Sequence, residues 1–241
     1  MHRTGQVALV TGAGRGIGRA IALRLAQQGI RCALTARTPD GLDETARLIR
    51  EHGGEVFTIT ADLMDHAAPE RIVASTIHQY GQLDILINNA GLLIVKPFAE
   101  TTMDEFDRTF TVNLRAPFAL IKAALPHLAA SSAGTVINID SAAGKRFYTG
   151  QSIYCASKHG LLGLSKVLAS ELRDQGIRVH AVCPGGVATE MTISQRPDWQ
   201  PEDLMAPDDI AEVVVFLLSL SKRATVDEIP IRRIAAEPLW G

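Results

Sequence analysis

Four side chains of this sequence can act together on a proton: Asn113, Ser141, Tyr154 and Lys158. Tyr154 and Lys158 are spaced i, i+4, so on a helix they would share one face with about 5–6 Å between their Cβ atoms. A free phenol has a pKa near 10, and an adjacent ammonium group favours the phenolate and lowers that pKa. The spacing therefore predicts a tyrosine that can pass a proton near neutral pH. Solvated helical pairs have the same spacing, so the rest of the chain must decide between the two interpretations.

The composition favours one domain that acts on small molecules. The chain has 241 residues, of which 46% are hydrophobic, enough for one sizeable core. The net charge is −2 and the basic residues are scattered, so nothing indicates a nucleic-acid partner. No apolar run reaches the length of about 18 residues that a membrane span needs, and residues 1–5 lead into a strand instead of a signal peptide. With three widely separated cysteines, we expect a cytoplasmic protein without a membrane partner.

Short apolar runs alternate with amphipathic stretches along the whole chain, and these must position the four side chains. Strands are expected at Val7–Val10, Arg31–Ala36, Glu55–Thr60, Ile85–Ile87, Thr135–Ile139 and Arg178–Val182. Helices are expected at Ile17–Gln28, Gly41–His52, Pro69–Tyr80, Met103–Ala129, Ser152–Gln175 and Pro207–Leu220. This alternation predicts a doubly wound α/β fold with a parallel sheet and helices on both faces. Pro117 should bend the fifth helix, and Thr102 with Glu105 should form a capping box at its start.

A glycine-rich turn follows the first expected strand and reads Thr11-Gly12-Ala13-Gly14-Arg15-Gly16-Ile17-Gly18. Glycines allow the backbone to approach a pyrophosphate, which the N–H groups at a helix N-terminus then bind. The strict Gly-x-Gly-x-x-Gly spacing is not met, because Ile17 stands where the third glycine would be. A structural turn without a ligand is the alternative, but four glycines at alternate positions exceed what a turn needs. We therefore predict a dinucleotide site.

The end of the second expected strand favours NADP(H) over NAD(H). A site for NAD would place an acidic residue there to bind the ribose 2′-hydroxyl. This chain has Ala36 followed by Arg37, whose guanidinium can pair with a 2′-phosphate, and Arg15 is a possible second cation. Two solvated arginines without a ligand are the alternative interpretation.

In its motifs and their order, nearly the whole chain resembles the short-chain dehydrogenase/reductase family, most of all the 3-oxoacyl-acyl-carrier-protein reductase type. On the cofactor side the resemblance rests on Gly12, Gly14, Gly16 and Gly18, on Asp62-Leu63, on Asn88-Asn89-Ala90-Gly91, and on Pro184-Gly185 with Val187 and Thr189. On the catalytic side it rests on Asn113, Ser141, Tyr154 and Lys158.

The resemblance implies a single Rossmann-type domain over residues 1–241, with a seven-stranded parallel sheet of order 3-2-1-4-5-6-7 and a last strand near Glu228–Arg232. It also implies a reaction, the transfer of hydride between the nicotinamide and a carbonyl or secondary alcohol. Ser141 would donate a hydrogen bond to the substrate oxygen and Tyr154 would protonate it. Lys158 would bind the nicotinamide ribose and lower the pKa of Tyr154, and Asn113 would hold a water that links Lys158 to solvent.

Two positions depart from the family's pattern. Asp140 precedes Ser141 where many relatives have a small or hydroxylated residue. Near the last strand, Val226-Asp227 continues as Glu228-Ile229 in place of the two glycines of many relatives. A homotetramer built through the fifth and sixth helices and the last strand is expected from the resemblance, with a dimer as the alternative.

Other features leave alternatives open. The segment Thr189–Ala206 is either a lid or disordered surface. The histidines show no metal-ligand spacing, so no metal site is predicted. Candidate substrates are 3-oxoacyl thioesters, small ketones and sugars, since likeness at the cofactor end says little about the substrate. A non-catalytic NADP(H) sensor or scaffold is the main functional alternative, and the intact set of Asn113, Ser141, Tyr154 and Lys158 argues against it.

Overall fold

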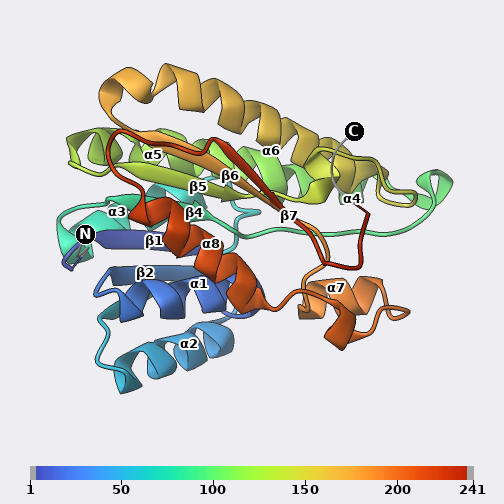
Figure 1. Ribbon diagram of the computed structural model, residues 1–241, viewed down its shortest axis with the longest axis horizontal. Helices are drawn as coiled ribbons and strands as arrows, with labels where there is room; N and C mark the ends of the chain where they lie inside the picture. Colours follow the sequence, from blue (N-terminus) through green and yellow to red (C-terminus); the bar gives the residue numbers. More distant parts are fainter. Residues whose placement is uncertain (1–3, 238–241) are drawn as a thin grey trace.

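A seven-stranded parallel sheet lies at the centre of the computed structural model, which describes residues 4–237 (Figure 1). The strand order is β3-β2-β1-β4-β5-β6-β7, which confirms the predicted Rossmann-type topology. The strands are β1 Val7–Thr11, β2 Arg31–Ala36, β3 Val56–Thr60, β4 Ile85–Asn88, β5 Thr135–Ile139, β6 Arg178–Pro184 and β7 Glu228–Ile231. The terminal residues of the domain predicted over 1–241 lie outside the described residues.

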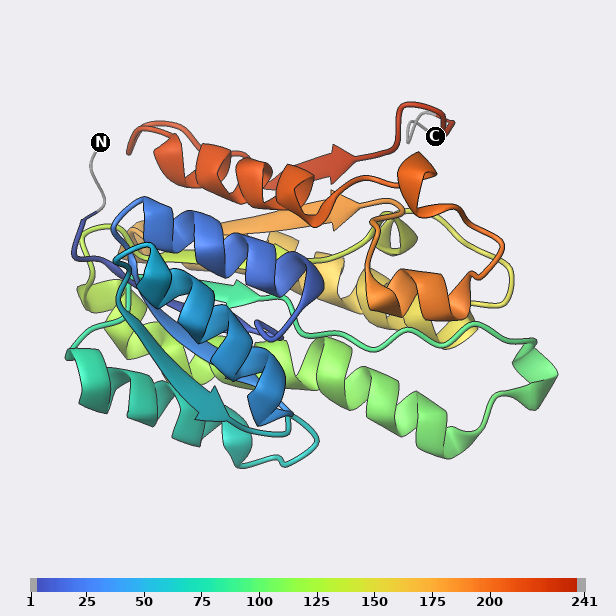
Figure 2. The same cartoon turned by 90° about the horizontal axis from the view of Figure 1, so that it is seen from below.

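Helices cover both faces of the sheet (Figure 2). One face carries α1 Gly16–Gln27, α2 Pro39–Glu51 and α8 Pro207–Ser219; the other carries α3 Ala68–Tyr80, α5 Ala116–Ala130 and α6 Ser152–Glu171. Helix α4 Met103–Phe110 packs against α6. Short helical turns complete the connections: η1 Phe98–Glu100, η3 Ala142–Gly144, η4 Arg173–Gln175 and η5 Pro201–Asp203.

The sheet divides the apolar core into two layers. Successive side chains of a strand point to opposite faces. Ala8 and Val10 of β1 therefore pack into the layer under α1 and α8, whereas Val7 and Leu9 pack into the layer under α3 and α5. All four are fully buried, which explains why β1 reads as a continuous apolar run.

The helix expected at 103–129 is in fact interrupted. α4 ends at Phe110, a π turn η2 covers Thr111–Arg115, and α5 follows. Pro117 has no N–H to donate to the carbonyl of Asn113, so the α pattern cannot continue past that residue. The Ala116 N–H bonds instead to Thr111, five residues back.

The predicted capping box at the start of α4 is confirmed. The Thr102 hydroxyl accepts a hydrogen bond from the Glu105 N–H at 3.2 Å, and the Glu105 carboxylate accepts one from the Thr102 N–H at 2.9 Å. This cap fixes where α4 begins and so sets the register of the π turn that carries Asn113.

The segment Thr189–Ala206 is structured. It contains α7 Glu190–Gln195 and η5, and a bridge between Val187 and Met205 closes its base. Two guanidinium groups lie close to the ring of Trp199, with its centroid 4.4 Å from Arg196 and 4.5 Å from Arg233. Aromatic and cationic groups in this arrangement attract one another and hold the segment against the chain that follows β7.

Candidate active site

The structure brings the four predicted catalytic side chains to the carboxyl edge of the sheet. Asn113 comes from the π turn, Ser141 follows β5, and Tyr154 and Lys158 lie on α6. Ser141 and Tyr154 are hydrogen-bonded, and the Lys158 ammonium lies 5.9 Å from the centre of the Tyr154 ring. Ligands of open α/β sheets bind at this edge.

Tyr154 has a raised pKa in this structure, and the sequence-based expectation of a lowered one is wrong. Burial of the phenol raises its pKa to about 12 and outweighs the hydrogen bond to Ser141, which lowers it. The charge of Asp140 raises it further. Ser141 is itself held in place because its hydroxyl accepts a hydrogen bond from the Ala143 N–H at 3.1 Å.

Lys158 is a buried cation, with 3% of its surface exposed. Its ammonium donates to the carbonyl of Ile139 at 2.9 Å, which ties α6 to the end of β5. Burial lowers the pKa of Lys158, and the charge of Asp140 opposes that change. The ammonium therefore depends on nearby negative charge to remain protonated.

Asn113 is fully buried and joins three segments. Its amide donates to the Leu92 carbonyl at 2.9 Å and accepts from the Leu92 N–H at 2.7 Å. It also donates to the Ser157 hydroxyl at 3.0 Å, beside Lys158 on α6. The side chain of Asn113 is thus already hydrogen-bonded to protein groups. Its main-chain carbonyl receives no hydrogen bond from Pro117, which has no N–H.

The glycine-rich turn at residues 12–18, called the glycine cradle below, is packed so closely that it has no room for side chains at Gly12 and Gly18. A Cβ on Gly18 would lie 2.3 Å from the carbonyl oxygen of Gly12, and one on Gly12 would lie 2.9 Å from the Cα of Ala90. Gly16 has a φ of +53°, which disfavours other residues. Only glycine fits at these positions, as in the tight turn of a dinucleotide site.

Asn89 and Ala90, the predicted partners of this turn, hold it from the β4 side. The N–H groups of both residues donate to the Thr11 hydroxyl at 3.0 Å. The Asn89 amide donates to the Thr11 carbonyl at 2.9 Å. Gly91 follows, next to the Asn113 amide.

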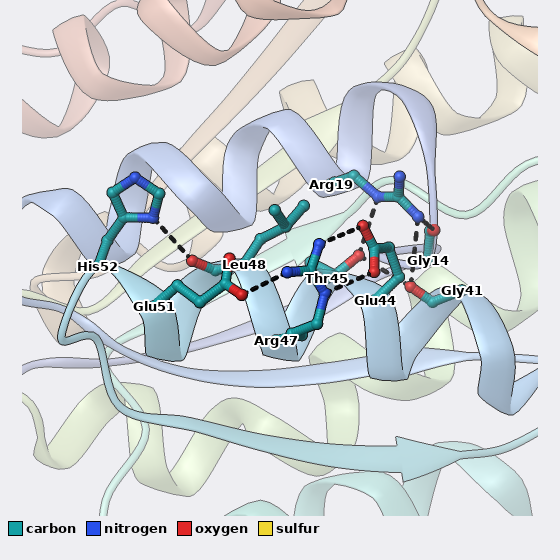
Figure 3. A network of polar contacts seen from close by, with 9 residues as sticks. All are labelled: Gly14, Arg19, Gly41, Glu44, Thr45, Arg47, Leu48, Glu51 and His52. Carbon is teal, nitrogen blue, oxygen red and sulfur yellow. Dashed lines mark hydrogen bonds and ion pairs between the residues drawn. The ribbon is translucent and has the colours of Figure 1, made fainter.

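A further support of the turn was missed by sequence reasoning (Figure 3). The Arg19 guanidinium donates to the Gly14 carbonyl at 2.5 Å and to the Thr45 hydroxyl at 3.1 Å, and Thr45 donates to the Ala13 carbonyl at 2.9 Å. Arg19 and Thr45 are 26 residues apart, and no motif links them. This network fixes the turn against α2.

The two arginines predicted at the adenosine phosphate differ. Arg37 follows β2 and is exposed, and it forms no ion pair within residues 4–237. Arg15 instead pairs with Glu190 of α7, so it holds that helix over the glycine-rich turn. Arg37 therefore differs from Arg15 in having no ion-pair partner among these residues.

Asp62 and Leu63 follow β3. The Asp62 carboxylate accepts a hydrogen bond from the Met64 N–H at 2.9 Å and remains exposed, while Leu63 packs against the core. This turn leaves a carboxylate oxygen accessible at the same edge of the sheet.

The segment predicted along the nicotinamide starts at the end of β6. Pro184 ends the strand, the Gly185 N–H donates to the Ile231 carbonyl at 2.7 Å, and Val187 is buried. Thr189 caps α7 through a 3.3 Å hydrogen bond from the Thr192 N–H. It lies against Gly16, so this segment is next to the glycine-rich turn.

Other features add no chemistry to this edge. Among the described side chains, no group of His, Cys, Asp and Glu is placed to hold a metal ion. Within residues 4–237, no helix has the length and apolar character needed to span a bilayer. His159 is exposed and its ring contacts the Cys155 carbonyl at 2.9 Å.

A family model described as short chain dehydrogenase matches residues 6–200. The chain belongs to this family. This short-chain dehydrogenase is therefore an oxidoreductase with a site for a nicotinamide cofactor, and the resemblance seen in its motifs is confirmed.

Among its relatives, an uncharacterised oxidoreductase from Thermotoga maritima is 38% identical over 206 residues, which cover 85% of this chain and 81% of that protein. A 3-oxoacyl-[acyl-carrier-protein] reductase from Staphylococcus aureus is 34% identical over 221 residues, covering 88% of this chain and 90% of that protein. The crystal structure of a metagenomic short-chain oxidoreductase in complex with NADP matches with a TM-score of 0.85 and 37% identity, covering 96% of this chain and 99% of that one.

Proposed function

We propose that this short-chain dehydrogenase reduces a carbonyl substrate, or oxidises the corresponding secondary alcohol, with NADP(H), and that Tyr154 is its acid and base. One observation carries this proposal: Ser141, Tyr154 and Lys158 meet at the edge of the sheet that also holds the glycine cradle. A protein that only binds nucleotide has no need of a phenol beside a buried ammonium.

The roles of the residues follow from their positions. When bound, NADPH supplies a hydride to the carbonyl carbon. Ser141 donates a hydrogen bond to the carbonyl oxygen, where negative charge develops. Tyr154 gives its proton to the same oxygen, and its raised pKa keeps it protonated for this step at neutral pH. In the oxidative direction the phenolate of Tyr154 is the base.

Lys158 and Asn113 support proton transfer. The buried Lys158 ammonium stabilises the phenolate that Tyr154 becomes after it has given up its proton. Solvent must then return a proton. The main-chain carbonyl of Asn113, which lacks an α-helical donor, is the group that would hold a connecting water, since the side chain is already bonded to Leu92 and Ser157.

The preference for NADP(H) rests on Arg37. Its guanidinium is exposed at the end of β2, and the residue before it is Ala36 in place of a carboxylate. The relative that was solved in complex with NADP is consistent with this choice. Asp62 would accept a hydrogen bond from the adenine, and Val187 and Thr189 would line the nicotinamide.

The proposed function is tested with purified protein and a panel of small ketones, 3-oxoacyl thioesters, sugars and secondary alcohols. We expect NADPH to be oxidised with at least one carbonyl compound, more efficiently than NADH, as followed by the nicotinamide absorbance. If no substrate of a broad panel is turned over but NADPH still binds, the protein is a nucleotide sensor or scaffold instead.

We also propose that the chain forms a homotetramer through α4, α5, α6 and β7, with a dimer as the alternative. A largely apolar groove runs over these helices, with Asp107 and Arg115 among its lining residues. Phe118, which is 53% exposed, lines it together with Phe110, Leu114 and Leu164. A second copy of the chain would cover this face.

The localisation that fits an NADPH-dependent reductase without paired cysteines is the cytoplasm.

Replacing Phe118 with glutamate is expected to break this assembly, because a carboxylate would be buried in an apolar contact. Sedimentation velocity should then show a smaller species than for the parent protein. The matched control is Phe98→Glu, since Phe98 is 81% exposed on η1, away from the groove. A parent protein that sediments as a monomer would contradict the proposed assembly.

A further inference from the structure

Asp140 is a buried carboxyl group that the proposed reaction does not use. It is 4% exposed and immediately precedes Ser141. Its N–H donates to the Val182 carbonyl at 2.7 Å, which fixes the residue between β5 and β6. Within the described part of the chain, neither of its carboxylate oxygens forms a hydrogen bond of normal geometry. Buried polar groups are seldom left unpaired, so this one needs a physical reason.

The carboxyl group of Asp140 lies close to α6, the helix that carries Tyr154 and Lys158. Gly144 separates the two: a Cβ on Gly144 would lie 3.0 Å from Asp140 Oδ2 and 3.0 Å from the main-chain oxygen of Lys158. The Lys158 ammonium binds the carbonyl of Ile139, the residue before Asp140. The absence of a side chain at Gly144 thus allows the carboxyl group to approach α6 closely.

The groups that act on Asp140 come from every neighbouring element. They are Lys158, His159 and Tyr154 on α6, Cys183 on β6 and Glu228 on β7. The backbone N–H of Ser141 also lowers the pKa of the Asp140 carboxyl group. Glu228 is bound by Lys145 and Lys166, so its own charge is largely compensated.

Burial of the Asp140 carboxyl raises its pKa to about 7, against the attraction of Lys158. Asp140 is therefore neutral in acid and becomes a carboxylate as the pH rises past neutrality. In that charged form it raises the pKa of both Lys158 and Tyr154. For Tyr154 this charge adds to burial, which is the larger cause of the raised pKa, and for Lys158 it opposes the effect of burial.

We propose that Asp140 is a positioning residue whose carboxylate, buried beside α6, opposes ionisation of Tyr154 and so sets the pH above which the phenolate becomes available as the base of alcohol oxidation. This role rests on the proposed function. In reduction the phenol O–H bond breaks as the proton passes to the substrate oxygen, and the hydride comes from NADPH, which is oxidised to NADP⁺. In oxidation the phenolate must form first, and the nearby carboxylate opposes it.

The variant Asp140→Asn tests this role, because it removes the charge and keeps the shape. The rate of oxidation of the alcohol that the panel identifies should increase at a pH about one unit lower than in the parent. Over the pH range in which the rate increases, the variant should then be about tenfold faster. In acid, where Asp140 is protonated in the parent, the two rates should coincide. The alkaline fall of carbonyl reduction should move to lower pH by the same amount.

A spectroscopic titration measures the same effect without turnover. The chain has three tyrosines, so the tyrosinate absorption of the nucleotide-free protein minus that of its Tyr154→Phe counterpart isolates Tyr154. This absorption should begin at lower pH when Asp140 is replaced. Asp140→Ser should give the same shift if charge is the cause. Asp174→Asn, which removes an exposed charge beyond α6, should give none.

The outcomes separate the two proposals. The role of Asp140 would be overturned by either of two results in both Asp140 variants. The tyrosinate titration and the pH dependence of alcohol oxidation could stay unchanged, or both could move to higher pH. A tyrosinate shift in a protein that transfers no hydride to any substrate of the panel would overturn the proposed reaction, while supporting the action of Asp140 on Tyr154.

Discussion

Replacing Tyr154 with phenylalanine is expected to lower kcat by about two to four orders of magnitude, the usual contribution of a general acid. The substitution removes only the hydroxyl, so the half-buried ring still packs between α6 and the end of β5. Ser141 loses one hydrogen bond but keeps the one from Ala143 that holds its side chain. Steady-state turnover with NADPH and the identified carbonyl substrate measures the loss.

Nucleotide binding should survive this change, since the glycine cradle and Arg37 are untouched. Titration of protein fluorescence with NADPH gives the affinity, which we expect to stay within about threefold of the parent value. Tyr148→Phe is the matched control, because Tyr148 is exposed in the loop before α6. Turnover by Tyr154→Phe within tenfold of the parent would remove the phenol from the mechanism.

The strands could be predicted closely because burial on both faces leaves a continuous apolar run. β2 and β5 have the predicted bounds, Arg31–Ala36 and Thr135–Ile139, and every residue of β5 is buried. The order of the strands came from the family resemblance, since apolar runs do not say which strands are neighbours. The π turn could not be placed: Pro117 predicts an interruption, but not its form.

The positions of the candidate catalytic residues were also predictable, because each lies on a motif at the end of a strand or on a helix. Their electrostatics were not. The i, i+4 spacing of Tyr154 and Lys158 suggests only that a cation lowers the pKa of the phenol, whereas burial and the charge of Asp140 raise it. Contacts between residues far apart in the sequence could not be predicted from local spacing either. The ion pair between Arg15 and Glu190, for example, joins residues that are 175 positions apart.

Replacing Arg37 with aspartate is expected to reverse the preference between NADPH and NADH. The guanidinium offers a charge-assisted pairing worth roughly 1.5–3 kcal/mol, so its loss alone should weaken NADPH binding by about tenfold to a hundredfold. The new carboxylate would also repel the 2′-phosphate, and it can accept a hydrogen bond from the ribose 2′-hydroxyl of NADH. Dissociation constants for both nucleotides, measured by fluorescence, give the ratio.

Two further variants separate this local effect from a general one. Arg50→Asp changes the net charge by the same amount at the far end of α2, and both affinities should stay near the parent values. Arg15→Gln should weaken NADPH binding less than Arg37→Asp does, because Arg15 is already paired with Glu190. If Arg37→Asp leaves the ratio of the two affinities unchanged, Arg37 does not contact the 2′-phosphate, and the choice of nucleotide must be made elsewhere at this edge of the sheet.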